Sequence, residues 1–338
     1  MSAYISLAAG LVLLIVGGEI LVRGAVRTAE RLGVSPLLIG LTLVGFGTSA
    51  PEMVISVQAA MSGSPGIAIG NFVGSSISNI FLILGLTAIL APIAVDSKAL
   101  NRDGSFVLIT AVLFAAAAAL LPYDGVVGWT FIALLVTYLI YAWQQEKGHS
   151  GDGHTSAYEI SQAYKELRAS AGHEPSVIEL RTRQTLLIIT PLTVAVLGLL
   201  TIIVGGRLLI DGAIEIARAL QVSETVIGLT IVAVGTSLPE LVTCVIAGLK
   251  NQPSVAIGNI LGSNIYNILA VGGMTAIMAP TTVPTHIIYF DNPVMIAASL
   301  LLLVFARTGF QISRLEGGLL FACYVAYIFV LWPNPAAV

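Results

Sequence analysis

The chain has 338 residues, of which 57% are hydrophobic and only 10% are charged. This composition is typical of integral membrane proteins, so we expect the lipid bilayer and no nucleic acid as a partner. The net charge of −3 says little, because the basic residues are unevenly distributed along the chain. The two cysteines, Cys244 and Cys323, lie in apolar runs, where packing is a more natural role than a disulfide.

Apolar segments recur along the whole chain. A helix needs roughly 20 apolar residues to cross a bilayer, and by that measure we expect ten spans. The first has no basic residue before it and no small-residue cleavage pattern after it, which indicates a retained span and not a signal peptide. The expected spans are 3–22, 35–61, 65–92, 104–122, 126–144, 185–210, 223–249, 254–280, 291–307 and 315–332.

The basic residues between these spans predict the orientation. Thirteen of the fifteen lysines and arginines fall on one side of a ten-span arrangement, and only Arg207 and Arg218 fall on the other. Basic loops remain in the cytoplasm. We therefore expect both termini to be extracytoplasmic and the loop 146–183 to be cytoplasmic.

Residues 40–52 contain Gly, Thr, Ser, Pro and a carboxylate within an apolar span, and they recur at 228–240. Between 40–60 and 228–248, 12 of 21 positions are identical without a gap. The offset of 188 residues crosses five spans, and because five is odd the two copies must have opposite orientations. Inverted repeats with interrupted helices are typical of secondary transporters, whose site lies at the midplane. We therefore expect an all-α integral membrane protein of ten transmembrane helices, in two inverted five-helix repeats with broken core helices.

Three regions follow from this repeat: a first five-helix repeat over 1–145, a cytoplasmic loop over 146–183, and a second five-helix repeat over 184–338. Within the loop, 156–167 carries a capping-box pattern and one apolar helical face, so either a short helix on the membrane surface or a flexible linker fits. The loop histidines His149, His154 and His173 match no tight metal-site spacing, and we expect them to be solvated.

The repeated motif predicts a broken helix with an acid at the break. Pro51 has no N–H to donate to the carbonyl of Gly47, and Pro239 has the same effect in the second copy. Proline suits the first turn of a new half-helix, with Ser or Thr capping just before it. Glu52 and Glu240 then lie in that first turn, where the helix dipole favours negative charge. A carboxylate at this depth is costly and indicates function.

The helix after each motif adds polar side chains on one face. The spacing i, i+4, i+8 places Asn71, Ser75 and Asn79 together, and Asn259, Ser263 and Asn267 repeat the pattern. Inversion about the midplane would bring both faces and both glutamates around one all-oxygen cage. Oxygen ligands suit hard cations such as Ca²⁺ or Na⁺.

Simpler interpretations apply to single residues. The Gly-x-x-x-Gly pairs at 70–74 and 258–262 fit helix packing, and we expect that role as well. Serine and threonine in membrane helices often bond to their own backbone. A cation channel, an intramembrane protease and a purely structural membrane protein are the rival classes. They predict, respectively, transport without a counter-ion, a pair of aspartates, and no buried polar repeat.

The two motifs, GTSAPE at 47–52 and GTSLPE at 235–240, are each followed by Gly-Asn-x-x-Gly-Ser and an Asn. Together they resemble the two alpha repeats of the sodium/calcium exchanger family, strongly over 17–92 and 205–280. The resemblance implies a prokaryotic-type antiporter with ten helices that exchanges inward Na⁺ for outward Ca²⁺ by alternating access. It implies no enzymatic activity and no cofactor beyond the transported ions.

The resemblance also implies the ligands. Glu52 and Glu240 would bind Ca²⁺, with backbone carbonyls from Thr48 and Thr236. The same two acids would take part in Na⁺ binding. The remaining Na⁺ ligands would be the carbonyls of Gly45 and Ala233, the hydroxyls of Ser49, Ser75, Ser237 and Ser263, and the amides of Asn79 and Asn267.

Asn267 departs from the family pattern, because some members have Asp there. This leaves the number and type of coupled ions open, and H⁺/Ca²⁺ antiport through the same two glutamates is the alternative function. We expect a multi-pass protein of the plasma (inner) membrane in which a monomer is sufficient.

Overall fold

The computed structural model describes residues 3–32, 34–61, 63, 65–97, 100–147, 177–219 and 233–331. Nearly all of these residues are helical, as the composition predicts. Eight helices are long and apolar enough to cross a membrane, and a bent pair over 36–61 adds a ninth. Within the expected span 223–249, the structure describes residues 233–249, which include the short apolar helix Leu238–Leu249. The count of ten spans remains a prediction.

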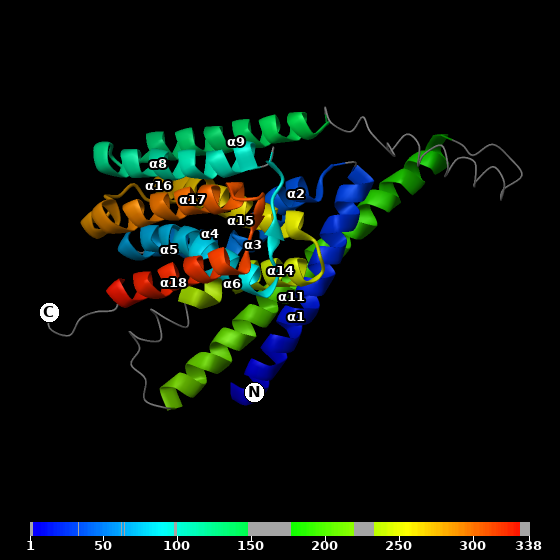
Figure 1. Cartoon of the computed structure of the whole chain (residues 1–338), viewed down its shortest axis with the longest axis horizontal. Coiled ribbons are helices and arrows are strands. Elements are labelled where there is room, and N and C mark those ends of the chain that lie inside the picture. The colour runs from blue at the N-terminus through cyan, green and yellow to red at the C-terminus, as the bar shows by residue number, and fades with distance from the viewer. Residues whose placement is uncertain are drawn as a thin grey trace, which may run out of the picture.

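The first repeat contains a long helix, a bent core helix, a second core helix and two outer helices (Figure 1). Its elements are α1 (Ala3–Leu32), α2 (Pro36–Ile39), η1 (Gly40–Val44), α3 (Gly45–Thr48), α4 (Ala50–Met61), α5 (Pro65–Ser78), η2 (Asn79–Leu84), α6 (Gly85–Leu90), β1 (Ile93–Ala94), η3 (Leu100–Gly104), α8 (Ser105–Leu120) and α9 (Gly125–Lys147). Segments marked η are π-helical.

The helices of the second repeat follow the same order in the part of the chain that the structure describes, but its strand lies between the two outer helices. Its elements are α11 (Val177–Ala219), α13 (Ala233–Thr236), α14 (Leu238–Leu249), α15 (Pro253–Tyr266), η5 (Asn267–Gly272), α16 (Gly273–Met278), η6 (Ile287–Asp291), α17 (Asn292–Arg307), β2 (Gln311–Ile312) and α18 (Arg314–Leu331). Helical structure therefore continues from α9 and α11 into both ends of the expected loop 146–183. The expected surface helix over 156–167 and the three loop histidines lie outside the described residues.

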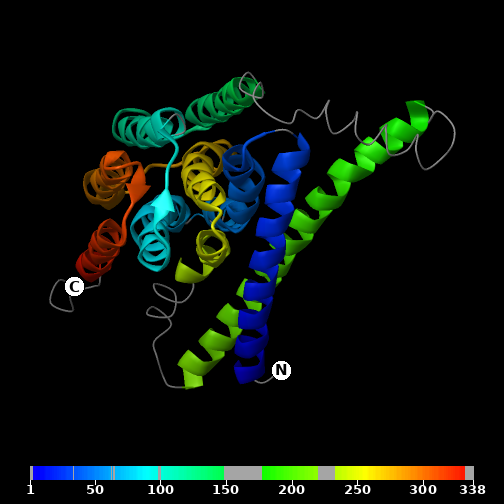
Figure 2. The ribbon, with the colours of Figure 1, turned by 45° about the vertical axis from the view of Figure 1, so that its right-hand side comes forward.

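Helices α1 and α11 form a crossed pair along one side of the bundle, as Figures 1 and 2 both show. Glycines allow their backbones to touch. A Cβ added to Gly24 would lie 2.4 Å from the backbone nitrogen of Ala195, and one added to Gly198 would lie 2.4 Å from that of Leu21. As residue numbers rise along α1, those of its contacts fall along α11, so the pair is antiparallel. We call this contact the glycine seam.

Contacts between loops support the alternation of the predicted spans. Strands β1 and β2 pair antiparallel with Ile93 opposite Ile312, and both loops are expected on the cytoplasmic side. On the opposite side, the backbone N–H of Thr281 donates to the carbonyl of Tyr123 at 3.0 Å. Each contact joins two loops that the ten-span arrangement places on the same face. The absolute orientation remains a prediction.

Both core helices of the motif are interrupted at a serine, as predicted. The chain turns at Ser49, with φ −81° and ψ 2°, and bends by 41° between the helices on either side. Ser237 has nearly the same backbone, with φ −90° and ψ 8°. The prolines thus begin new half-helices, α4 and α14, whose first turns contain Glu52 and Glu240.

The second core helix of each repeat contains a π-helical segment that the sequence analysis does not anticipate. Segments η2 and η5 begin at Asn79 and Asn267, which are equivalent residues in the two repeats. π-Helical turns are frequent at functional sites, because they shift side chains out of the regular helical register. The hydroxyl of Tyr123 donates to the carbonyl of Gly272, at the end of η5, at 2.8 Å.

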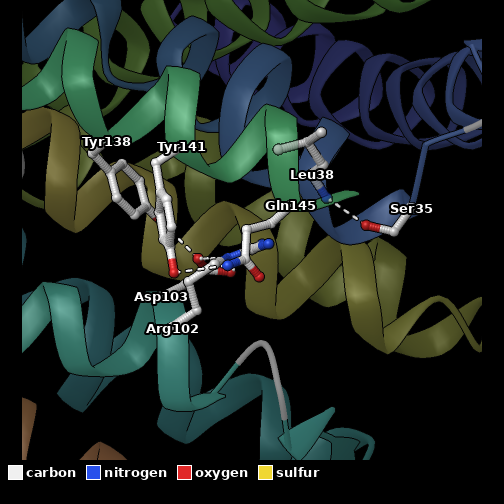
Figure 3. A network of polar contacts seen from close by, with 7 residues as sticks. All are labelled: Ser35, Leu38, Arg102, Asp103, Tyr138, Tyr141 and Gln145. Carbon is white, nitrogen blue, oxygen red and sulfur yellow. Dashed lines mark hydrogen bonds and ion pairs between the residues drawn. The ribbon is translucent and has the colours of Figure 1, made fainter. Parts of the chain in front are cut away.

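A buried ion pair fixes the start of α8 to α9 (Figure 3). Asp103 is fully buried and receives two hydrogen bonds from the guanidinium of Arg102, at 2.6 and 2.9 Å, and one from the hydroxyl of Tyr138 at 2.7 Å. The equivalent Asp291 accepts from Tyr327 at 2.8 Å and pairs with the more exposed His286 at 3.0 Å. Both repeats thus use an aspartate to join their two outer helices.

Candidate functional site

The two interrupted helices place their acids inside the protein. Glu52 and Glu240 are buried, with exposed fractions of 0% and 1%. Neither has an ion-pair partner among the described residues. A buried carboxylate without a compensating partner is unfavourable, so this arrangement requires a bound cation or a proton at the site.

Each acid is bound to the serine of the opposite repeat. The hydroxyl of Ser49 donates to Oε1 of Glu240 at 3.4 Å, and the hydroxyl of Ser237 donates to Oε1 of Glu52 at 3.4 Å. The prediction that these serines cap their own half-helices with their side chains is wrong for Ser237, which makes no such bond. Its hydroxyl instead donates to the carboxylate of Glu52 across the site. The two acids therefore face one shared space.

Several buried polar atoms of the predicted site residues have no hydrogen-bond partner among the described residues. They are Oε2 of Glu52, Oε2 of Glu240, and both amide atoms of Asn79 and of Asn267. Buried polar groups are normally paired. The four oxygens among these atoms have no donor and could coordinate a cation.

Thr48 is at the centre of the contacts between the repeats. Its hydroxyl lies 3.1 Å from Oδ1 of Asn259, 3.3 Å from the hydroxyl of Ser263 and 3.4 Å from the carbonyl of Gly45. The carbonyl of Gly45 also receives the N–H of Ser49 at 3.1 Å and the hydroxyl of Ser263 at 3.5 Å. The carbonyl of Gly45, an expected Na⁺ ligand, therefore already accepts hydrogen bonds from nearby donors.

The remaining predicted site residues lie close to this set. Ser75 is buried on α5, which packs against α4, the half-helix of Glu52. Thr236 is buried directly before the Ser237 turn. Ala233 is the first described residue of α13, and the motif residues before it lie outside the described part of the chain.

Helix α15 of the second repeat packs directly on the interrupted helix of the first. A Cβ on Gly258 would lie 2.4 Å from the carbonyl oxygen of Leu37, and one on Gly262 would lie 2.4 Å from that of Leu41. The predicted packing role of this glycine pair is confirmed. For Gly70 and Gly74, no described atom lies within 4 Å of an added Cβ. The repeat relates their expected neighbours to residues 225 and 229, which lie outside the described residues.

Two residues make contacts beside the site that the sequence analysis did not predict. Cys244 was expected only to pack, yet it accepts a hydrogen bond from Nδ2 of Asn259 at 3.2 Å. Asn71 donates to the backbone carbonyl of Glu52 at 3.2 Å and to the hydroxyl of Ser56 at 3.0 Å. The polar stripe on each helix was the available signal, but it did not show which way each amide points.

Comparison with known proteins identifies a family and several relatives. A profile of the family described as sodium/calcium exchanger protein matches residues 2–145 and 190–332. The sodium/calcium exchanger MaX1 of Methanosarcina acetivorans is 35% identical over 358 aligned positions, which cover 97% of this chain and 98% of the relative. The putative antiporter CaxA of Alkalimonas amylolytica is 37% identical over 331 positions, covering 96% and 97%.

A solved structure has the same fold. It is the sodium-calcium exchanger NCX_Mj soaked with 10 mM Na⁺ and zero Ca²⁺, which superposes with a TM-score of 0.80 at 31% sequence identity. The match covers 97% of this chain and 98% of the other. The likeness therefore extends over both repeats and the outer helices.

Proposed function

The chain belongs to the sodium/calcium exchanger family, and from this premise we propose that it exchanges Na⁺ for Ca²⁺ across the plasma membrane. It is a multi-pass membrane transporter and not an enzyme, and the family supports antiport of Ca²⁺ against another cation. The finer claim, that the coupled cation is Na⁺, is the proposal.

The observation that carries the proposal is the reciprocal pair of serine–glutamate bonds around unpartnered oxygens. Two carboxylates, hydroxyls and amide oxygens, without nitrogen or sulfur ligands, match the preference of Ca²⁺ and Na⁺. Ser49 and Ser237 hold one oxygen of each acid, and Oε2 of Glu52 and of Glu240 has no hydrogen-bond partner among the described residues and is available to an ion.

We assign Ca²⁺ to the centre of this arrangement, where Glu52 and Glu240 are joined by the backbone carbonyls of Thr48 and Thr236. We assign Na⁺ to the surrounding positions, where both acids also take part. The other Na⁺ ligands are the carbonyls of Gly45 and Ala233, the hydroxyls of Ser49, Ser75, Ser237 and Ser263, and the amides of Asn79 and Asn267.

Charge explains why such a site exchanges ions instead of leaking them. One Ca²⁺, or Na⁺ ions in its place, neutralises the two carboxylates. An empty site leaves buried charge, which is unfavourable in a closed, dry conformation. Loaded forms therefore change conformation and the empty form does not, and the inverted repeats supply equivalent gates on the two sides.

Protons are the alternative coupling ion, because they also neutralise carboxylates. Two observations favour Na⁺. Among the relatives that match over nearly the whole chain, MaX1 is described as a sodium/calcium exchanger, and so is the solved structure. The site is also rich in hydroxyl and amide oxygens, which coordinate Na⁺ and which proton transfer between two acids does not need.

For the orientation, we propose that both termini are extracytoplasmic and that 146–183 is cytoplasmic, from the distribution of basic residues. All proposed ligands come from one chain, so a monomer is sufficient for the site.

The proposal is tested by ⁴⁵Ca²⁺ uptake into proteoliposomes loaded with Na⁺, with K⁺-loaded, choline-loaded and acid-loaded vesicles as controls. We expect uptake only when the Na⁺ gradient is directed outward. Uptake driven by the acid-loaded vesicles would assign the chain to H⁺/Ca²⁺ antiport. Uptake without any counter-ion gradient would contradict exchange altogether.

A further inference from the structure

The side chain of Asn259 joins the two repeats beside the site. It is fully buried on α15, one turn before Ser263. Its Nδ2 donates to the thiol of Cys244 on α14 at 3.2 Å, and its Oδ1 lies 3.1 Å from the hydroxyl of Thr48 on α3. A single amide thus connects a half-helix of the second repeat to the break in the first.

The equivalent amide in the first repeat is anchored differently. Asn71 donates both to the hydroxyl of Ser56 at 3.0 Å and to the backbone carbonyl of Glu52 at 3.2 Å, and both acceptors belong to α4. Ser56 and Cys244 are equivalent positions in the repeat. A serine with a second acceptor beside it therefore holds Asn71, whereas a thiol holds Asn259.

The thiol determines which end of the Asn259 amide faces the site. The S–H of Cys244 is directed at the carbonyl of Ala256 at 3.7 Å, so the sulfur lone pairs remain to accept from Nδ2. Oδ1 of Asn259 is then turned to the hydroxyls of Thr48, at 3.1 Å, and Ser263, at 3.4 Å. Without the sulfur acceptor, a rotated amide would present N–H groups to these hydroxyls.

We propose that Asn259, held by Cys244, is a positioning residue that fixes Thr48 and thereby sets the affinity of the site for Ca²⁺. The inference rests on the proposed function, in which the backbone carbonyl of Thr48 is a Ca²⁺ ligand. A hydroxyl has one hydrogen to donate, and Oδ1 of Asn259 is the nearest acceptor to Thr48. The amide therefore gives the Thr48 hydroxyl its shortest contact, and neither Asn259 nor Cys244 is among the proposed ligands of the ion.

The expected effect differs between the two ions. Ser263 and the carbonyl of Gly45, which are proposed Na⁺ ligands, contact each other directly at 3.5 Å. When the amide turns, Ser263 loses a longer contact with Oδ1 of Asn259, at 3.4 Å, and keeps the carbonyl of Gly45, whereas Thr48 loses its shortest contact, at 3.1 Å. A change at Cys244 should thus affect Ca²⁺ more than Na⁺.

The test compares Cys244→Ala, Cys244→Ser and Ser56→Ala by ⁴⁵Ca²⁺ uptake at varied Ca²⁺ and Na⁺ concentrations. For Cys244→Ala, we expect the Ca²⁺ concentration for half-maximal uptake to rise about three- to tenfold, the effect of one lost hydrogen bond, and that for Na⁺ to change by less than about twofold. Cys244→Ser should restore wild-type values, because a hydroxyl can accept from Asn259 and donate to Ala256. Ser56→Ala should have the smaller effect, since Asn71 keeps its second acceptor.

Cys323→Ala, on α18, controls for the loss of a thiol as such, and thermal unfolding controls for folding. Equal shifts for both ions, an unchanged Cys244→Ala variant, or a folded Cys244→Ser variant without rescue would each overturn the inference. If the wild type takes up no Ca²⁺ under a Na⁺ gradient, the proposed function fails instead. In that case equilibrium ⁴⁵Ca²⁺ binding to the same purified variants still tests the positioning role, with the same order of affinities expected.

Discussion

The hydroxyl of Ser49 donates to a carboxylate oxygen of Glu240, 191 residues away, at 3.4 Å. In the repeat-related pair, the hydroxyl of Ser237 donates to a carboxylate oxygen of Glu52, also at 3.4 Å. The internal symmetry of the chain therefore extends from the backbone to individual side-chain bonds. Each acid depends on a residue of the opposite repeat, and the effects of equivalent substitutions should be similar.

Ser49→Ala and Ser237→Ala should each raise the Na⁺ concentration needed for half-maximal Ca²⁺ uptake by about tenfold, because a methyl group can neither donate to the opposite acid nor coordinate Na⁺. The Na⁺ concentration for half-maximal Ca²⁺ uptake measures this effect. Ser299→Ala is the matched control, since Ser299 is equally buried but, among the described residues, its hydroxyl bonds to the carbonyl of Met295 on its own helix. A large effect from only one of the two site serines would contradict the symmetry.

Glu52→Gln and Glu240→Gln should each reduce Ca²⁺ uptake to the level of protein-free vesicles. Glutamine preserves the volume, so the protein should still insert, but it removes a negative charge that Ca²⁺ requires. Uptake and the amount of protein in the membrane fraction are measured together. Glu19→Gln is the control, because Glu19 is half-exposed and pairs with Lys250 away from the site. Ca²⁺ flux similar to wild type in either site variant would refute the assignment.

Gly258→Ala and Gly262→Ala should destabilise the protein by about 1–3 kcal/mol, the usual effect of overpacking. Each added methyl would lie 2.4 Å from a backbone carbonyl of the interrupted helix. Thermal unfolding in detergent measures the change. Gly318→Ala, where no described atom lies within 4 Å, should leave the midpoint unchanged or raise it, because alanine favours helix. An unshifted midpoint in both Gly258→Ala and Gly262→Ala would show that the helices separate easily.

Arg102→Ala should destabilise the fold by about 3–5 kcal/mol, because it leaves the fully buried Asp103 carboxylate with Tyr138 as its one side-chain partner among the described residues. His286→Ala, its counterpart in the second repeat, should change stability by less than about 1 kcal/mol, since the His286 side chain is 61% exposed. Thermal unfolding of the two variants gives the comparison. A larger loss from His286→Ala would show that the second pair matters more than its exposure indicates.

Much of the site follows from local sequence. Proline at 51 and 239 favours a helix break, and an apolar span that contains an acid indicates a buried site. The spacing of Asn71, Ser75 and Asn79 gives a shared helical face. These features depend on residues near each other in the chain, so periodicity and backbone chemistry are sufficient to predict them.

Contacts across the repeats are harder to predict. A serine before a proline favours a helix cap, and only the folded chain shows that the Ser237 hydroxyl is turned to Glu52 instead. A cysteine in an apolar run indicates packing, so the bond from Asn259 to Cys244 has no signal in the sequence. The π-helical segments at Asn79 and Asn267 depend on packing between helices that are distant in the sequence. A local sequence pattern does not predict such packing.

The glycine seam between α1 and α11 has a consequence for biogenesis. Translation at about 5–20 residues per second places roughly 10–40 s between the synthesis of α1 and the completion of α11. During that interval α1 lies in the membrane without its partner. A face made of glycines exposes no side-chain hydrogen-bonding group to lipid while it waits, whereas a polar face would be costly there. The seam is therefore suited to a helix that enters the membrane long before its partner is made.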